Sequence, residues 1–132
     1  MEEKVMGQIH NLDKKSLKRY KKWIKAKRKK YVKYSKKWCP FDGSYLYNTI
    51  KMILRDMAEY YKNGDNVWGT PMRADENGNL IEKDDRYGTL TEALGLLEIA
   101  ELDEEFGEYE LSQQQFRIAF SYIAEHMNEW WD

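Results

Sequence analysis

The residue types best suited to catalysis or metal binding are rare in this sequence: it has one cysteine, Cys39, and two histidines, His10 and His126. A zinc site needs several Cys or His ligands at short spacings, and a thiol nucleophile needs a base beside it. The three residues lie far apart in the sequence, and neither H-E-x-x-H nor E-x-x-H occurs. The sequence therefore predicts no catalytic residue and no metal ligand among them. Cys39 is interpreted as a small buried residue at a helix end.

The stretch DENGN at 75–79 places Asp75, Asn77 and Asp84 at positions similar to those of an EF-hand calcium loop. The first ligand position would then be Arg73, a cation where the loop needs a carboxylate. The stretch is therefore interpreted as a turn, and Asn77-Gly78 is a dipeptide typical of a short hairpin.

Carboxylates crowd residues 98–110, and paired carboxylates can act as general acid and base. The members of this run are Glu98, Glu101, Asp103, Glu104, Glu105, Glu108 and Glu110. No histidine accompanies them, so they are interpreted as a solvated acidic face. The chain also lacks a Gly-rich phosphate loop, G-x-S-x-G and G-x-G-x-x-G. The sequence predicts a protein that is not an enzyme and takes no cofactor.

The strongest chemical signal is positive charge. Residues 14–38 hold fourteen Lys or Arg among twenty-five residues, and no acidic residue occurs between Asp13 and Asp42. Residues 1–39 carry a net charge of +12 and residues 40–132 a net charge of −13, which together give the −1 of the whole chain. Cations spread along about 37 Å of helix can neutralise several phosphates. The expected nucleic-acid-binding or partner-binding residues are Lys18, Arg19, Lys21, Lys22, Lys25, Arg28, Lys29, Lys33 and Lys36.

Apolar and aromatic residues recur through the same segment at helical spacing. They are Leu17, Tyr20, Ile24, Tyr31, Tyr34 and Trp38, with Trp23 at the edge of the stripe. The aromatic rings can stack on exposed bases, or the stripe can face the core of the protein, and the helical spacing favours burial. The cations can likewise face a partner or pair with the acidic half of the chain. Exposed ion pairs contribute only about 0–1 kcal/mol each, so we expect part of the cationic surface to face outward.

The helices that must position these residues can be placed from their ends. We expect a first helix over 14–38, capped by Asp13 or Asn11 and stopped before Pro40. A second helix is expected over 43–62, capped by Asp42 or Ser44 and ended by the Asn-Gly pair at 63–64.

Two capping-box patterns predict the starts of the last two helices, T-x-x-E at 89–92 and S-x-x-Q at 112–115. The third helix is expected to end before Gly107, and residues 65–88 form a loop or a short hairpin. The sequence thus predicts an all-α fold, a four-helix bundle-like or irregular helical domain spanning residues 1–132.

Composition sets the remaining bounds. The chain has 132 residues, of which 42% are hydrophobic, enough for one packed domain, and a single cysteine forms no intrachain disulfide. No apolar run approaches the ~18 residues of a membrane span, and the N-terminus lacks the apolar region of a signal peptide. We expect a cytoplasmic protein without a membrane partner, and a homodimer is one possible state.

One segment resembles a known type of protein. In residues 39–64, CPFDGSYLYNTIKMILRDMAEYYKNG, an aromatic residue and an aspartate precede a helix of the form L-x-x-x-(I/L)-x-x-x-L-x-x-M-x-x-Y. The matching positions are Phe41, Asp42, Leu46, Ile50, Leu54, Met57 and Tyr60. With TLTEALGLLE at 89–98, this segment resembles small uncharacterised helical accessory proteins of bacteriophages, over about residues 39–100. The resemblance implies a phage-encoded protein that acts by binding. It also implies, as one class, inhibitors of host-defence complexes such as CRISPR nucleoproteins.

Two functional hypotheses follow. In the first, the basic helix docks on nucleic acid or on a host nucleoprotein, or on an acidic host protein. In the second, the protein is an inhibitor that binds a protein partner through its acidic helix face or the 65–88 loop, in one form as a mimic of nucleic acid. The residues expected for this second surface are Glu101, Asp103, Glu104, Glu105 and Trp68.

Overall fold

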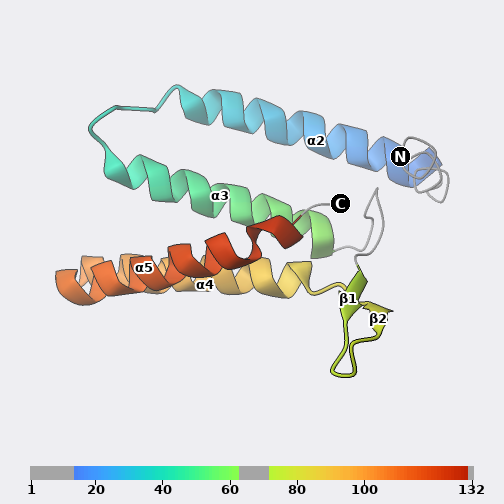
Figure 1. Cartoon of the computed structure of the whole chain (residues 1–132). Coiled ribbons are helices and arrows are strands. Elements are labelled where there is room, and N and C mark those ends of the chain that lie inside the picture. The colour runs from blue at the N-terminus through green and yellow to red at the C-terminus, as the bar shows by residue number, and fades with distance from the viewer. Residues whose placement is uncertain (1–13, 63–71, 131–132) are drawn as a thin grey trace. The chain divides into compact units, whose positions relative to one another are not determined.

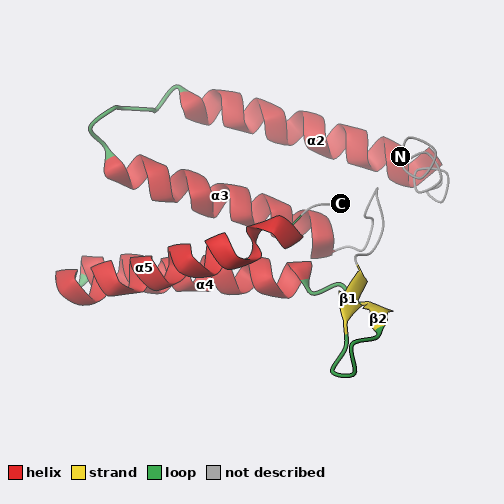
Figure 2. Cartoon of the chain, viewed as in Figure 1, coloured by secondary structure: helices red, strands yellow, loops and turns green. Residues whose placement is uncertain are grey.

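The computed structural model describes residues 14–62 and 72–130, and in this part the fold is all-α, as the sequence predicts (Figures 1 and 2). Its elements are α2 (Lys14–Ser35), α3 (Gly43–Lys62), β1 (Met72–Ala74), β2 (Leu80–Glu82), α4 (Arg86–Glu105), α5 (Tyr109–His126) and the 3-10 turn η1 (Met127–Glu129). The described residues divide into two compact units. The first contains residues 14–45 and 72–84, and the second contains residues 46–62 and 85–130.

The basic helix α2 ends at Ser35, one turn earlier than the predicted end at residue 38. The Ser35 hydroxyl donates to the carbonyl oxygen of Val32 at 2.6 Å, a local hydrogen bond that competes with continuation of the helix. The amides of Lys37 and Trp38 then donate to carbonyls only three residues back, which forms a turn. The predicted caps, Asp13 and Asn11, lie outside the described residues.

The start of α3 is fixed by a side-chain cap, as predicted. Asp42 Oδ1 accepts hydrogen bonds from the Ser44 hydroxyl at 2.5 Å and from the Ser44 amide at 3.1 Å. The hydroxyl bond stabilises the charged carboxylate and lowers the pKa of Asp42 below its usual value of 3.8. Close by, the rings of Tyr34 and Tyr45 stack with centroids 4.8 Å apart, and the Tyr45 hydroxyl donates to the Tyr34 carbonyl at 3.3 Å. These contacts join the end of α2 to the start of α3 through the first unit.

The hydrophobic core of the second unit lies where α3, α4 and α5 meet. It contains Leu54, Ala58, Tyr61, Leu90, Ala93, Leu97, Ala119 and Trp130, all buried. Three of the eight are alanines, one from each helix, and α5 packs closely against α4. Trp130 reaches the core because η1 turns the chain back after α5. Its indole Nε1 donates to the Thr89 hydroxyl at 2.8 Å.

Both capping-box predictions are wrong by one helical turn, because α4 begins at Arg86 and α5 at Tyr109. The hydroxyls that suggested the caps lie inside the helices and bond elsewhere. Thr89 donates to the Asp85 carbonyl and accepts from Trp130, and buried Ser112 donates to the Ala100 carbonyl at 2.7 Å. A hydroxyl buried between helices needs a hydrogen-bond partner, and here that requirement explains the residue type.

The predicted end of α4 before Gly107 is confirmed. Gly107 has a positive φ of 78°, which glycine adopts without steric cost. The Gly107 amide donates to the Glu104 carbonyl at 3.0 Å, and the Glu108 amide donates to the Asp103 carbonyl at 2.9 Å. This pair of bonds is the Schellman motif, and it reverses the chain so that α5 packs against α4 (Figure 1).

Of the two forms expected around Asn77-Gly78, a loop or a short hairpin, the structure has the hairpin. Strands β1 and β2 pair antiparallel, with Met72 opposite Glu82 and Ala74 opposite Leu80. Asp75 Oδ1 accepts from the amides of Asn77 at 2.9 Å and Asn79 at 2.8 Å. The Asp75 carboxylate therefore holds the turn itself, which supports the interpretation of DENGN as a turn.

Candidate nucleic-acid interface

The nine predicted binding residues of the basic segment are all exposed, and α2 contains no buried residue. At 3.6 residues per turn, eleven of the twelve Lys and Arg of α2 fall within an arc of about 200° around the helix axis. Only Val32 and Ala26 interrupt this cationic arc, and Lys27 alone lies outside it. The helix α2 therefore presents positive charge over more than half of its circumference.

Most of these cations have no partner in the part of the chain that the structure describes. Arg19 donates to the Ser16 hydroxyl at 3.0 Å, and the ammonium groups of Lys27 and Lys30 lie over the rings of Trp23 and Tyr31. The other eleven cations form no ion pair with any described residue. They are Lys14, Lys15, Lys18, Lys21, Lys22, Lys25, Arg28, Lys29, Lys33, Lys36 and Lys37. Eight of the nine predicted binding residues belong to this set.

The aromatic stripe lies on the opposite side of α2 from the centre of the cationic arc. The side chains of Leu17, Tyr20, Ile24, Tyr31 and Tyr34 are half-buried rather than buried, and so is Trp23. Trp38 is 63% exposed, because α2 ends before it and the helical register does not reach it. Three of the rings have contacts within the first unit, with Tyr45, Lys27 and Lys30.

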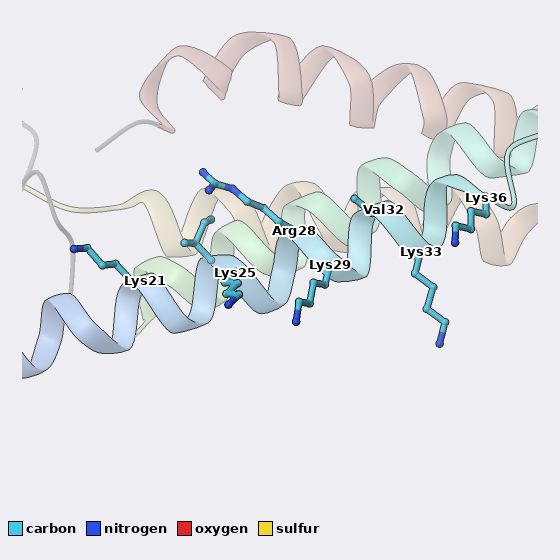
Figure 3. Close-up of a pocket in the computed structure, with 8 residues that line it drawn as sticks. Lys21, Lys25, Arg28, Lys29, Val32, Lys33 and Lys36 are labelled. Carbon is cyan, nitrogen blue, oxygen red and sulfur yellow. The ribbon is translucent and has the colours of Figure 1, made fainter.

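A hollow along α2 is lined by two apolar residues, Val32 within the cationic arc and Ile24 from the stripe beside it (Figure 3). Its other lining residues are Lys21, Lys25, Arg28, Lys29, Lys33 and Lys36, all from α2 and the turn that follows it. In Figure 3 the side chain of Arg28 extends to one side of the helix, whereas those of Lys29 and Lys33 extend to the other. The long aliphatic stems of such side chains cover apolar surface while their charged ends reach solvent.

The carboxylates predicted as the alternative surface form two groups, those with an ion pair and those without one among the described residues. Glu101 pairs with Lys51 of α3, and Glu98 approaches Arg55 with 3.4 Å between Oε1 and NH2. In contrast, Asp103, Glu104 and Glu105 form no ion pair with the described residues, and the same holds for Glu108 and Glu110. Glu101 is thus a structural residue of the second unit. Trp68 lies outside the described residues.

Three exposed apolar side chains beside this acidic face are absent from the sequence-based candidates. Leu102 is 51% exposed, Phe106 76% and Tyr109 70%, and they flank the Gly107 turn. We refer to residues 102–110 as the α4–α5 tip. The signal for it was present in the sequence, because Gly107 marks a helix end and large apolar residues next to such a turn lie at the end of a helical hairpin.

Three buried charged residues were also missed, Lys51, Asp56 and Arg86. Lys51 is only 7% exposed, and its ammonium group lies 5.7 Å from the Tyr47 ring centroid as well as against Glu101. Arg86 is 1% exposed, with its guanidinium carbon 4.2 Å from the Tyr61 ring centroid. Lys51 stands between apolar residues and Arg86 follows two aspartates, and neither setting distinguishes a buried cation from an exposed one in the sequence.

Of the residues first considered for chemistry, Cys39 belongs to the first unit and His126 to the second. Cys39 is a free, half-buried thiol in the turn after α2, less buried than expected. His126 Nδ1 lies 2.8 Å from Glu129 Oε2, and its ring packs on Tyr122. Burial and the nearby Glu92 carboxylate raise the pKa of Tyr122 to about 12. Within residues 14–62 and 72–130, no three His, Cys, Asp or Glu side chains gather as metal ligands would. His10 lies outside these ranges.

None of the described helices is both long enough and apolar enough to cross a membrane. Comparison with known proteins finds no matching family model, no matching curated protein and no matching solved structure.

Proposed function

We propose that this protein is a non-enzymatic binding protein whose basic helix α2 docks on nucleic-acid phosphates, free or within a nucleoprotein. The observation that carries the proposal is the set of eleven exposed cations without an ion pair among the described residues. A solvated helix face normally mixes charges of both signs, whereas the sequence 14–41 contains no acidic residue at all. The excess of positive charge is therefore best explained by a polyanionic partner.

The physical basis of this binding is counterion release. Each phosphate neutralised by Lys or Arg releases condensed cations, so the logarithm of the affinity falls by about 0.9 per phosphate for each tenfold rise in salt. Lysine dominates the arc, with Arg19 and Arg28 the only arginines in α2. Lysine is a point charge without the planar fork of arginine, which suits contacts with phosphate more than recognition of particular bases.

The phage context comes into the proposal through the resemblance of residues 39–100. The resemblance implies a host nucleoprotein, such as a CRISPR complex, as the next partner whose binding should be measured after binding to free nucleic acid. In that case the phosphates would belong to the guide or target strand of the complex.

The test is a pair of matched charge-reversal variants. The first carries Lys21→Glu, Lys25→Glu and Arg28→Glu in the arc, and the control carries Lys62→Glu, Lys83→Glu and Arg117→Glu at exposed positions elsewhere. Both change the net charge equally. We expect the arc variant to lose binding to labelled nucleic acid by on the order of a hundredfold or more, and the control to lose much less. Equal losses in both variants, or no binding by the wild-type protein at low salt, would refute the proposal.

The α4–α5 tip supports a second candidate function, binding of a protein partner. Phe106 and Tyr109 are large exposed apolar side chains next to carboxylates that form no ion pair among the described residues, a combination that suits a partner with an apolar pocket and a basic rim. In this alternative the carboxylates can occupy a site meant for phosphates. Capture of a host protein that is lost with Phe106→Ser and Glu105→Lys, and kept with the arc variant, would favour the tip over the helix.

A further inference from the structure

Resting on the proposed function, we infer that the ligand of α2 is double-stranded DNA and that the helix lies in the major groove, in contact with phosphates of both strands. The inference depends on how the cations are distributed around the helix and on where the aromatic rings lie.

The cationic arc is too wide for a helix that lies flat on one strand. A helix resting on a single row of phosphates uses cations on one side only, whereas the arc of α2 spans about 200°. Two flanks can be defined within it, each made of three cations that have no ion pair among the described residues. The first flank is Lys14, Lys21 and Arg28, and the second is Lys22, Lys29 and Lys33.

The two flanks point about 100° apart around the axis, with Lys18 and Lys25 between them. Figure 3 shows the same division, with Arg28 on one side and Lys29 and Lys33 on the other. In a groove, the residues between the flanks would face the floor and the flanks would face the two phosphate walls. The B-form major groove is about 12 Å wide and admits a helix, which with its side chains is about 10–12 Å across.

Other nucleic acids fit this distribution less well. The major groove of A-form RNA is deep and narrow, so a helix does not enter it readily. Single strands are bound by aromatic rings set among cations. In α2 the rings lie on the side opposite the middle of the arc, and Tyr34 already stacks on Tyr45.

The same residues indicate that binding depends little on sequence. Adenine in the major groove is read mainly by bidentate Asn or Gln, and α2 contains neither; guanine is read by Arg or Lys, so the lysines between the flanks, Lys18 and Lys25, can contact guanine without distinguishing other bases. Of its two arginines, Arg19 bonds to Ser16, which leaves Arg28 as the one without a contact in the described part of the chain. The expected contacts are therefore mostly to phosphate.

The experiment measures fluorescence anisotropy of the full chain with a labelled DNA duplex, a DNA single strand and an RNA duplex of one sequence, each over a salt series. A straight helix follows a curved groove over only part of its length, so we expect about six phosphate contacts on duplex DNA. The logarithm of the binding constant plotted against the logarithm of the salt concentration should then have a slope near −5, or about −0.9 for each phosphate. Neutralising either flank, by Lys14→Gln, Lys21→Gln and Arg28→Gln or by Lys22→Gln, Lys29→Gln and Lys33→Gln, should make the slope shallower by about 2 to 3.

Glutamine has a helix propensity close to that of lysine, so both variants should keep the far-ultraviolet circular dichroism of the wild-type protein. Tightest binding to duplex DNA with equal effects of the two flanks supports the inference. Tighter binding to RNA duplex or single strand, or a flank whose neutralisation leaves the slope unchanged, overturns it while the proposed function stands. Absence of binding to all three refutes the proposed function itself.

Discussion

Replacing Glu101 by glutamine should destabilise the second unit strongly, although Glu101 belongs to a run of carboxylates that reads as solvent-exposed. The carboxylate pairs with Lys51, whose side chain is 9% exposed, while the side chain of Glu101 is 26% exposed. Glu101→Gln leaves the Lys51 ammonium buried with only the Tyr47 ring and a neutral amide beside it. Breaking a buried pair from one side costs about 3–5 kcal/mol, and the partial exposure of Glu101 places this case near 3 kcal/mol.

The assay is equilibrium unfolding in urea at neutral pH, with circular dichroism as the readout. The matched control is Glu105→Gln. Glu105 lies on the same helix, is exposed and forms no ion pair among the described residues, so its replacement should change the free energy of unfolding by less than about 0.5 kcal/mol. A double variant, Lys51→Met with Glu101→Leu, should recover most of the loss because it removes both charges. If Glu101→Gln is as stable as Glu105→Gln, the buried pair does not hold α3 to α4 and the reasoning fails.

Two further predictions concern single groups of the second unit. The pKa of Tyr122 is raised to about 12, so this tyrosine favours the fold fully below its unfolded pKa of about 10, and that contribution is lost as the pH rises from 10 to 12. A spectrophotometric titration should therefore show a late-ionising tyrosine that the variant Tyr122→Phe removes. Gly107→Ala should destabilise the protein by about 1 kcal/mol because φ at this position is +78°. Gly95→Ala, at a helical position where a new Cβ meets nothing within 4 Å, should stabilise it by about 0.5–1 kcal/mol. The midpoint temperatures of thermal unfolding of the two variants should therefore move in opposite directions.

The sequence predicts the helices well where a local signal fixes an end. The bounds of the second helix, 43–62, match α3, and Asp42 caps its start, whereas the Asn-Gly pair expected to end it lies outside the described residues. The end of α4 is equally local, because only Gly107 accepts the positive φ of the Schellman turn. Both signals act within a few residues and do not depend on the rest of the fold.

The starts of α4 and α5 could not be placed in this way because their hydroxyls serve tertiary contacts. Thr89 and Ser112 satisfy the local pattern of a capping box, but each hydroxyl bonds to a group far along the chain, Trp130 or Ala100. The same limit applies to Glu101, whose structural role appears only once α3 lies beside α4. For the basic helix the sequence predicts that part of the cationic surface faces outward; the cations of the arc are exposed on α2, and their role in binding stays a prediction.

The absence of acidic residues from α2 has an energetic consequence that bears on its partner. Like charges at i and i+4 destabilise a helix by about 0.2–0.5 kcal/mol per pair, and α2 contains several such pairs, among them Lys18 with Lys22 and Lys21 with Lys25. No ion pair among the described residues relieves them. A polyanion removes this repulsion when it binds, so part of the binding free energy stabilises the helix itself. An acidic protein surface with a few carboxylates would relieve fewer pairs than a continuous row of phosphates, and this difference supports the proposal that α2 binds nucleic acid.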